Sequence, residues 1–183
     1  MAGVKGALDV HRELLARDVP HEMVRLPGRA TTGDDLPRLL GLTSGCLAVR
    51  CYEAERTTGT AFVAVLVPAG RLPQPGALLE ALDARSVRPA RPDAVNAATD
   101  FAHGLVCPVG LPPQVELLAD TALGESDVSY CPVGEGQVVL GIRTRDLLVA
   151  VGARAASLTG PLPGADLADV LDLERWSGAR TAG

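Results

Sequence analysis

An eight-residue apolar run, TAFVAVLV at residues 60–67, sets the strongest limit on the fold. It lacks the polar alternation of a half-exposed strand, and such runs are typical of central strands buried on both faces. Residues 46–52 form a second apolar segment, and the polar residues 53–59 between the two indicate a turn. The sequence therefore predicts a β-hairpin at the centre of a sheet.

Shorter helices and strands surround this hairpin in an irregular order. Helices are predicted at residues 4–17, 32–40, 76–84, 92–99 and 143–151. Further strands are predicted at residues 21–26, 86–90, 114–118, 128–131, 137–142 and 153–158. Several helices have only two turns, and strands do not alternate regularly with helices. This pattern favours an α+β fold with a mixed sheet over a doubly wound parallel sheet.

The domain organisation follows from length and from one change in composition. The chain has 183 residues, which suits one domain with short additions. The Gly- and Pro-rich segment at 160–164 marks a boundary. We therefore expect a domain at residues 1–160 and an appendage at 161–183, comprising a linker and a short helix that either packs back on the domain or binds a partner.

Charge and aromatic content limit the ways in which the protein can bind nucleic acid. Seventeen basic and 22 acidic residues give a formal net charge of −5, which argues against a broad basic binding surface. Aromatic residues make up 3% of the chain, too few for a platform on which successive bases stack. Contact with only the end of an RNA remains compatible with both numbers.

Export, membrane and metal signals are absent from the sequence. Residues 1–8 lack the order of a secretory signal, and no apolar run approaches the roughly 20 residues of a membrane helix. The four cysteines show no C-x-x-C spacing and no nearby histidine pair, so we expect neither a metal site nor another cofactor. We expect reduced thiols, a cytoplasmic location and no membrane contact.

Residues 101–110 carry the most informative motif, FAHGLVCPVG, in which an aromatic residue precedes Gly-x-x-x-Pro and a further Gly. An extended segment ending in Asp120 follows, then a strand, RDLL at 145–148 and GAR at 152–154. In this order the elements resemble the YbaK-type aminoacyl-tRNA deacylase family, which includes the editing domain of bacterial prolyl-tRNA synthetases. The resemblance extends over about residues 4–160.

The resemblance implies a mixed, curled and barrel-like β-sheet flanked by short helices, with a pocket for the aminoacyl end of a mischarged tRNA. It implies hydrolysis of the ester bond by a positioned water, a reaction known as trans-editing. Backbone amides of the loop would hold the substrate, since Gly104 allows close approach and Pro108 stiffens the loop. The implied partner is the acceptor end of tRNA or an aminoacyl small molecule, alone or together with an aminoacyl-tRNA synthetase. The protein itself is expected to be a monomer or a homodimer.

One position departs from the family pattern. The family places a substrate-contacting lysine at the start of the strand near residue 46, and Leu47 stands at the matching position. Arg50 lies three residues on, which on a regular strand is the opposite face, so that a bulge or register shift would be needed to bring it to the pocket. Other candidate cations are Arg25, Arg29 and Arg143.

The missing lysine leaves three functions open. The first is a deacylase that uses another cation. The second is a divergent member that binds or transforms an aminoacyl ester or a related small molecule in a specialised biosynthetic pathway. The third is a non-catalytic binding module that acts through the C-terminal helix.

Five further residues are candidates for the site, four of them with a structural alternative. His103 is a base or substrate contact, or a histidine bonded to the loop; imidazoles in general titrate near pH 6.5. Cys107 is a nucleophile or a small filler beside the proline. Phe101 and Thr32 are candidate substrate contacts, and Thr32 also begins a T-x-x-D capping box. Asp120 is a substrate contact or a cap of the following turn.

Overall fold

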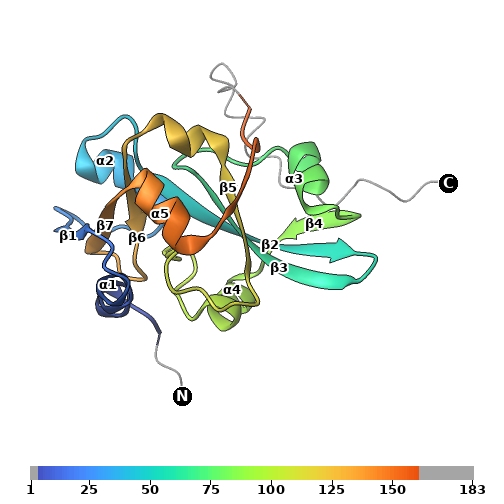
Figure 1. Cartoon of the computed structure of the whole chain (residues 1–183), viewed down its shortest axis with the longest axis horizontal. Helices are drawn as coiled ribbons and strands as arrows, with labels where there is room; N and C mark the ends of the chain where they lie inside the picture. Colours follow the sequence, from blue (N-terminus) through green and yellow to red (C-terminus); the bar gives the residue numbers. More distant parts are fainter. Residues whose placement is uncertain (1–3, 161–183) are drawn as a thin grey trace.

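A computed structural model describes residues 4–160, so the expected appendage at 161–183 lies outside the described residues. Its framework is two β-sheets (Figure 1). The first sheet has the order β1 (His21–Arg25), β7 (Val138–Arg143) and β6 (Val128–Pro132). The second has the order β4 (Ser86–Pro89), β2 (Leu47–Arg56), β3 (Gly59–Pro68), β5 (Glu116–Asp120) and β8 (Arg154–Ala156).

The predicted hairpin lies where the apolar pattern places it. β2 and β3 pair in continuous antiparallel register from Leu47–Pro68 to Arg56–Gly59. β3 is the middle strand of its sheet, and residues 63–67 are fully buried. Covering both faces of β3 removes its valines and leucine from water, which accounts for the lack of polar alternation in this strand.

The five-stranded sheet is mixed, as predicted, but it is not barrel-like. β2 pairs antiparallel with β3 and β4, whereas β3–β5 and β5–β8 are parallel. In the described chain β4 and β8 are the two edges of this sheet and do not pair with each other. The expectation of a sheet curled into a barrel is therefore wrong. A single parallel bridge between Cys46 and Tyr130 links the two open sheets instead.

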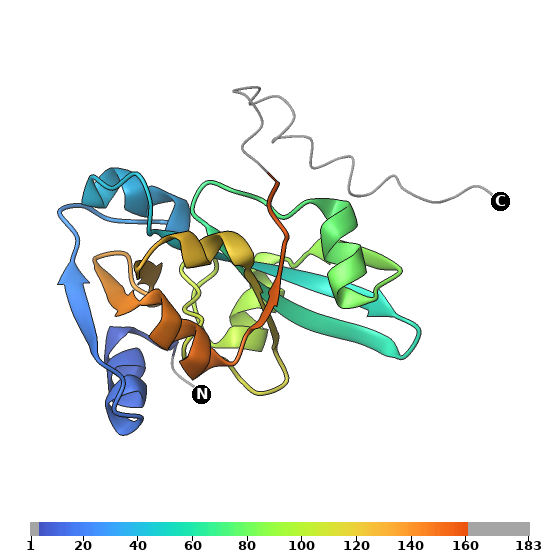
Figure 2. The ribbon, with the colours of Figure 1, turned by 45° about the horizontal axis from the view of Figure 1, so that its top comes forward.

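Among residues 4–160, five short α-helices flank the sheets. They are α1 (Ala7–Ala16), α2 (Leu36–Leu40), α3 (Pro75–Leu82), α4 (Pro92–Thr99) and α5 (Thr144–Val151). Both views place α1 beside the three-stranded sheet and α3 beside the far end of the β2–β3 hairpin (Figures 1 and 2). In the described residues, none of these helices has the length and apolar character to cross a membrane.

The core is divided between the two faces of the hairpin. Leu47 and Leu66 belong to the largest cluster, which also contains residues of α1, α5, β6 and β7. Tyr52, Val63 and Val65 belong to a second cluster with α3 and β4. Because side chains alternate along β2, successive residues of this strand serve different cores. Both cores therefore depend on the register of one strand.

Candidate functional site

The Gly-x-x-x-Pro loop at 104–108 docks against the segment that precedes η1 (Gly33–Asp35), a 3₁₀ turn. Gly104 has φ +85°, and a Cβ on it would lie 2.7 Å from the Thr31 carbonyl oxygen. The Gly33 N–H donates to the Gly104 carbonyl at 3.1 Å. Backbone conformation and close approach thus both require glycine at this position. The glycine of the motif joins two segments that are about seventy residues apart in the chain.

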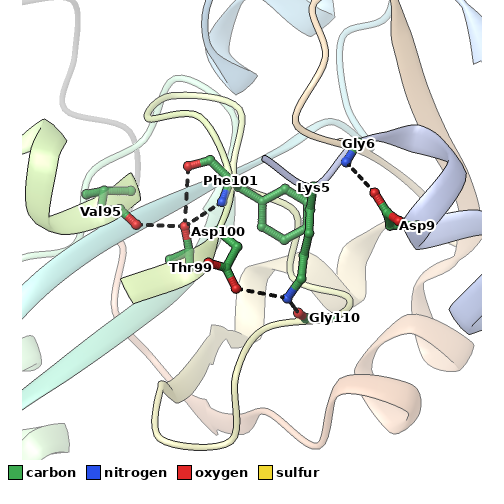
Figure 3. A network of polar contacts seen from close by, with 8 residues as sticks. All are labelled: Lys5, Gly6, Asp9, Val95, Thr99, Asp100, Phe101 and Gly110. Atoms are coloured by element: carbon green, nitrogen blue, oxygen red, sulfur yellow. Dashed lines mark hydrogen bonds and ion pairs between the residues drawn. The ribbon is translucent and has the colours of Figure 1, made fainter. Parts of the chain in front are cut away.

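Lys5, the only lysine of the chain, holds the two ends of this loop (Figure 3). Its Nζ donates to the Gly110 carbonyl at 2.7 Å and lies 3.5 Å from Asp100 Oδ2. The same nitrogen lies 5.8 Å from the centre of the Phe101 ring. The Lys5 backbone N–H also donates to the Asp100 carbonyl. One side chain therefore fixes both the entry and the exit of the loop.

Several residues that the sequence proposed for the site lie in the interior instead. Phe101 and Leu47 are 1% and 0% exposed, and both belong to the largest core cluster. Cys107 is also fully buried, and Pro108 is buried beside it. A hydrogen bond with Cys107, together with burial, raises the pKa of Cys131 well above its ordinary range. The buried Cys107 side chain thus faces another thiol, and its role as a nucleophile stays a prediction.

Arg50 and His103 come together at a small cavity of about 170 Å³. We call it the Arg50 cavity; its other walls include the apolar side chains of Tyr52, Leu72, Ala90 and Val95. It opens where the pairing of β4 with β2 ends, because β4 pairs only with the β2 residues from Tyr52 to Glu55. His103 is exposed, and its backbone N–H donates to Asn96 Oδ1 at 2.7 Å. This is a concave, mainly apolar site with a cation and an imidazole at its wall.

Arg50 reaches this cavity without a bulge. β2 keeps regular register with β3 on both sides of Arg50. The consecutive β2 residues Arg50, Cys51 and Tyr52 all line the cavity, whereas Leu47 does not. Arg50 Nη2 donates to Asp34 Oδ1 at 2.8 Å and to the Arg71 carbonyl at 3.1 Å. The other candidate cations, Arg25, Arg29 and Arg143, are exposed elsewhere.

Thr32 and Asp120 both cap turns. Thr32 Oγ1 accepts from the Asp34 N–H at 3.2 Å, and the predicted capping box with Asp35 is present. Asp120 is 2% exposed and accepts from the backbone N–H groups of Ala122 and Thr159 and from the Thr159 hydroxyl. It therefore ties the end of β5 to the last described segment of the chain.

A larger cavity of about 400 Å³ lies where the two sheets meet. Its walls include Gly45, Cys46, Gly70, Arg71, Ser126 and Ser129. None of the residues that the sequence analysis proposed for substrate or catalysis lines it, and we regard the Arg50 cavity as the candidate site. Among residues 4–160 there is no group of three or more His, Cys, Asp or Glu side chains that could hold a metal ion.

Two features of the site could not be found in the sequence. Asp34, which binds Arg50, is next to the residues of the capping box but forms no part of that motif. Leu72 closes one side of the cavity from a loop after β3. Both depend on how distant segments pack, and no spacing along the chain signals them.

Thiols near the cavities are desolvated. Burial raises the pKa of Cys51, which lines the Arg50 cavity, to about 12, and that of Cys46 to about 11. A thiol with such a pKa is protonated at neutral pH and is a poor nucleophile. Cys51 is therefore a weak candidate for a nucleophile at the Arg50 cavity.

Comparisons with known proteins agree with this fold. The profile of the aminoacyl-tRNA editing domain family matches residues 50–149. The crystal structure of hypothetical protein APE2540 superposes with a TM-score of 0.72 at 25% identity, covering 82% of this chain and 99% of that protein. A suggested trans-editing enzyme for prolyl tRNA synthetase superposes with a TM-score of 0.71 at 22% identity, covering 85% and 97%. No curated protein matches this chain.

Proposed function

Because this chain belongs to the aminoacyl-tRNA editing domain family, we propose that it hydrolyses the ester bond of a mischarged aminoacyl-tRNA in trans. The observation that carries the proposal is the meeting of Arg50 and His103 at one cavity beside the Gly-x-x-x-Pro loop. Arg50 takes the part that the family gives to a lysine.

In this proposal Arg50 binds an oxygen of the substrate, either on the ester carbonyl or on the terminal nucleotide. A fixed cation stabilises the negative charge that develops on the carbonyl oxygen as water attacks. His103 accepts the proton of that water and returns it to the ribose oxygen that leaves. Backbone N–H groups of the loop hold the aminoacyl end. The N–H groups of His103 and Leu105 already donate within the protein. Other N–H groups of the loop, among them that of Gly104, therefore bind the substrate.

The size and charge of the protein fit a limited contact with the substrate. A cavity of about 170 Å³ with apolar walls suits a small aminoacyl group. A protein with a net charge of −5 has few basic groups to spare for neutralising phosphates. It would therefore contact only the acceptor end of the tRNA or act beside a synthetase.

The test is deacylation of alanyl-, seryl- and cysteinyl-tRNA by the full chain and by variants of Arg50 and His103. We expect turnover of at least one of these tRNAs, a loss of about 10²–10³-fold in kcat/KM for Arg50→Ala, and partial activity for Arg50→Lys. His103→Gln should reduce kcat by about 10²-fold. Arg88→Ala, which removes an exposed arginine from β4, is the control and should have little effect.

Two results would contradict the proposal. Unchanged turnover by Arg50→Ala removes the cation from the mechanism. No turnover of any tRNA in the panel, with binding of a small aminoacyl ester or aminoacyl-adenylate analogue that Arg50→Ala abolishes, would assign the cavity to a small molecule instead.

A further inference from the structure

The carboxylate of Asp34, in η1, binds the guanidinium group of Arg50, in β2. Asp34 Oδ1 accepts from Arg50 Nη2 at 2.8 Å and from the Gly70 N–H at 2.7 Å. Arg50 Nη2 donates in addition to the Arg71 carbonyl at 3.1 Å. Asp34 Oδ1 and Arg50 Nη2 thus connect η1, β2 and the loop after β3. Leu72, in the same loop, lines the cavity.

These contacts occupy only one corner of the guanidinium group. Within the described residues, Arg50 Nε is buried and has no hydrogen-bond partner. A buried donor without an acceptor is costly, so the bonds at Nη2 must offset this cost to hold Arg50 in place. Because the guanidinium is planar and rigid, fixing Nη2 also fixes the directions in which the remaining N–H groups point.

We propose that Asp34 is a positioning residue for Arg50, which orients the remaining guanidinium donors toward an oxygen of the aminoacyl substrate without touching that substrate itself. The inference rests on the proposed function, in which Arg50 binds the substrate. Arginine has a longer reach and more rotamers than the task requires, so a second anchor is needed to keep it at the cavity wall.

A second ion pair of similar distance and exposure serves as a control, because it separates a positioning role of Asp34 from an effect on stability alone. Arg56 Nη2 lies 2.8 Å from Glu116 Oε2, with side chains 24% and 31% exposed, against 21% and 35% for Arg50 and Asp34. Arg56 likewise donates to a backbone carbonyl, that of Leu82. This pair lines none of the cavities described above. Each carboxylate has one further contact, Glu116 with Arg154 Nη2 at 3.3 Å and Asp34 with the Gly70 N–H. Loss of either carboxylate should therefore cost similar stability, but only loss of Asp34 should affect turnover.

The experiment compares Asp34→Asn and Glu116→Gln in the full chain, using the aminoacyl-tRNA that the parent protein hydrolyses. We expect Asp34→Asn to lower kcat/KM by about 10- to 100-fold. Glu116→Gln should stay within about 2-fold of the parent, with a similar change in thermal midpoint. Asp34→Glu, which returns the carboxylate, should recover part of the loss.

A double-mutant cycle decides whether Asp34 acts through Arg50. In an Arg50→Ala background, Asp34→Asn should change kcat/KM by less than about 2-fold, since the group that it positions is gone. Losses that multiply in the double variant would overturn the inference, as would full activity of Asp34→Asn alone.

The failure of the inference is distinguishable from that of the proposed function. If Arg50→Ala loses activity and Asp34→Asn does not, only the positioning role falls. If Arg50→Ala keeps full activity, or the parent hydrolyses none of the tRNAs, the proposed function falls and the positioning role with it.

Discussion

At the scale of single residues, Gly104 combines a left-handed backbone with a neighbour that leaves no room for a side chain. Gly104→Ala should therefore lower the free energy of unfolding by at least about 1–2 kcal/mol, the cost of a left-handed alanine, and displace the loop from the Thr31 carbonyl. Chemical denaturation measures the first effect, and deacylation activity reports the second.

Gly76→Ala is the control for this substitution. Gly76 lies in α3 with nothing within 4 Å of its Cβ position, so alanine there should leave stability unchanged or raise it. Equal stability of the parent and Gly104→Ala would show that the loop does not need glycine.

Leu47 provides a second prediction at this scale, because the sequence analysis places it where the family pattern would have lysine. Its side chain is fully buried among apolar residues, so Leu47→Lys would bury an unpaired ammonium group. We expect a loss of several kcal/mol in unfolding free energy and no gain in deacylation. Leu47→Met, which keeps an apolar chain, should retain most of the stability. A stable and more active Leu47→Lys would return the cation site to residue 47.

At the scale of elements, Lys5 is a clamp between the segment before α1 and both ends of the loop at 101–110. Lys5→Met keeps the apolar stem but removes the donor and the charge. We expect it to cost about 1–2 kcal/mol and to speed hydrogen exchange in the loop. The measurement is amide exchange by mass spectrometry over residues 101–110.

The role of the Lys5 charge can also be tested by chemical modification, because the chain has a single lysine. Acetylation of its amines removes the charge, whereas reductive methylation preserves it, and both reagents react only at Lys5 and the N-terminal amine. The acetylated protein should resemble Lys5→Met and the methylated protein should resemble the parent. Identical loop exchange in all of these forms would contradict the clamp.

The same scale shows what the sequence could predict. The apolar run gave the central strand, the T-x-x-D motif gave the cap before α2, and Pro92 gave the start of α4, because each signal is local. The open sheets could not be predicted, since the parallel pairing of β5 with β3 and β8 depends on tertiary packing. For the same reason Arg50 could be named as a candidate from the sequence, but its contact with Asp34 could not.

At the scale of the whole molecule, three ionisable groups in and just before β2 affect the response of the protein to alkali. Burial raises the pKa of Cys46 to about 11 and those of Cys51 and Tyr52 to about 12. In the unfolded chain these groups lose their protons at lower pH than in the folded protein. The stability they contribute is therefore complete below about pH 9 and declines as pH rises further.

We expect the free energy of unfolding to fall between about pH 9 and pH 11, as measured by urea denaturation at a series of pH values. The double variant Cys46→Ala, Cys51→Ala should show a shallower decline. The same slope in the parent and the variant would show that these thiols do not carry the pH dependence.

The pairing of β1 with β7 has a consequence for synthesis on the ribosome. β1 ends at Arg25 and its partner begins at Val138, so more than a hundred residues must be translated before the two can meet. At about 5–20 residues per second, the nascent chain carries an unpaired β1 for roughly 6–23 s. The sequence of this strand, HEMVR, is polar at three of its five positions, which suits a segment that must wait in water without aggregating.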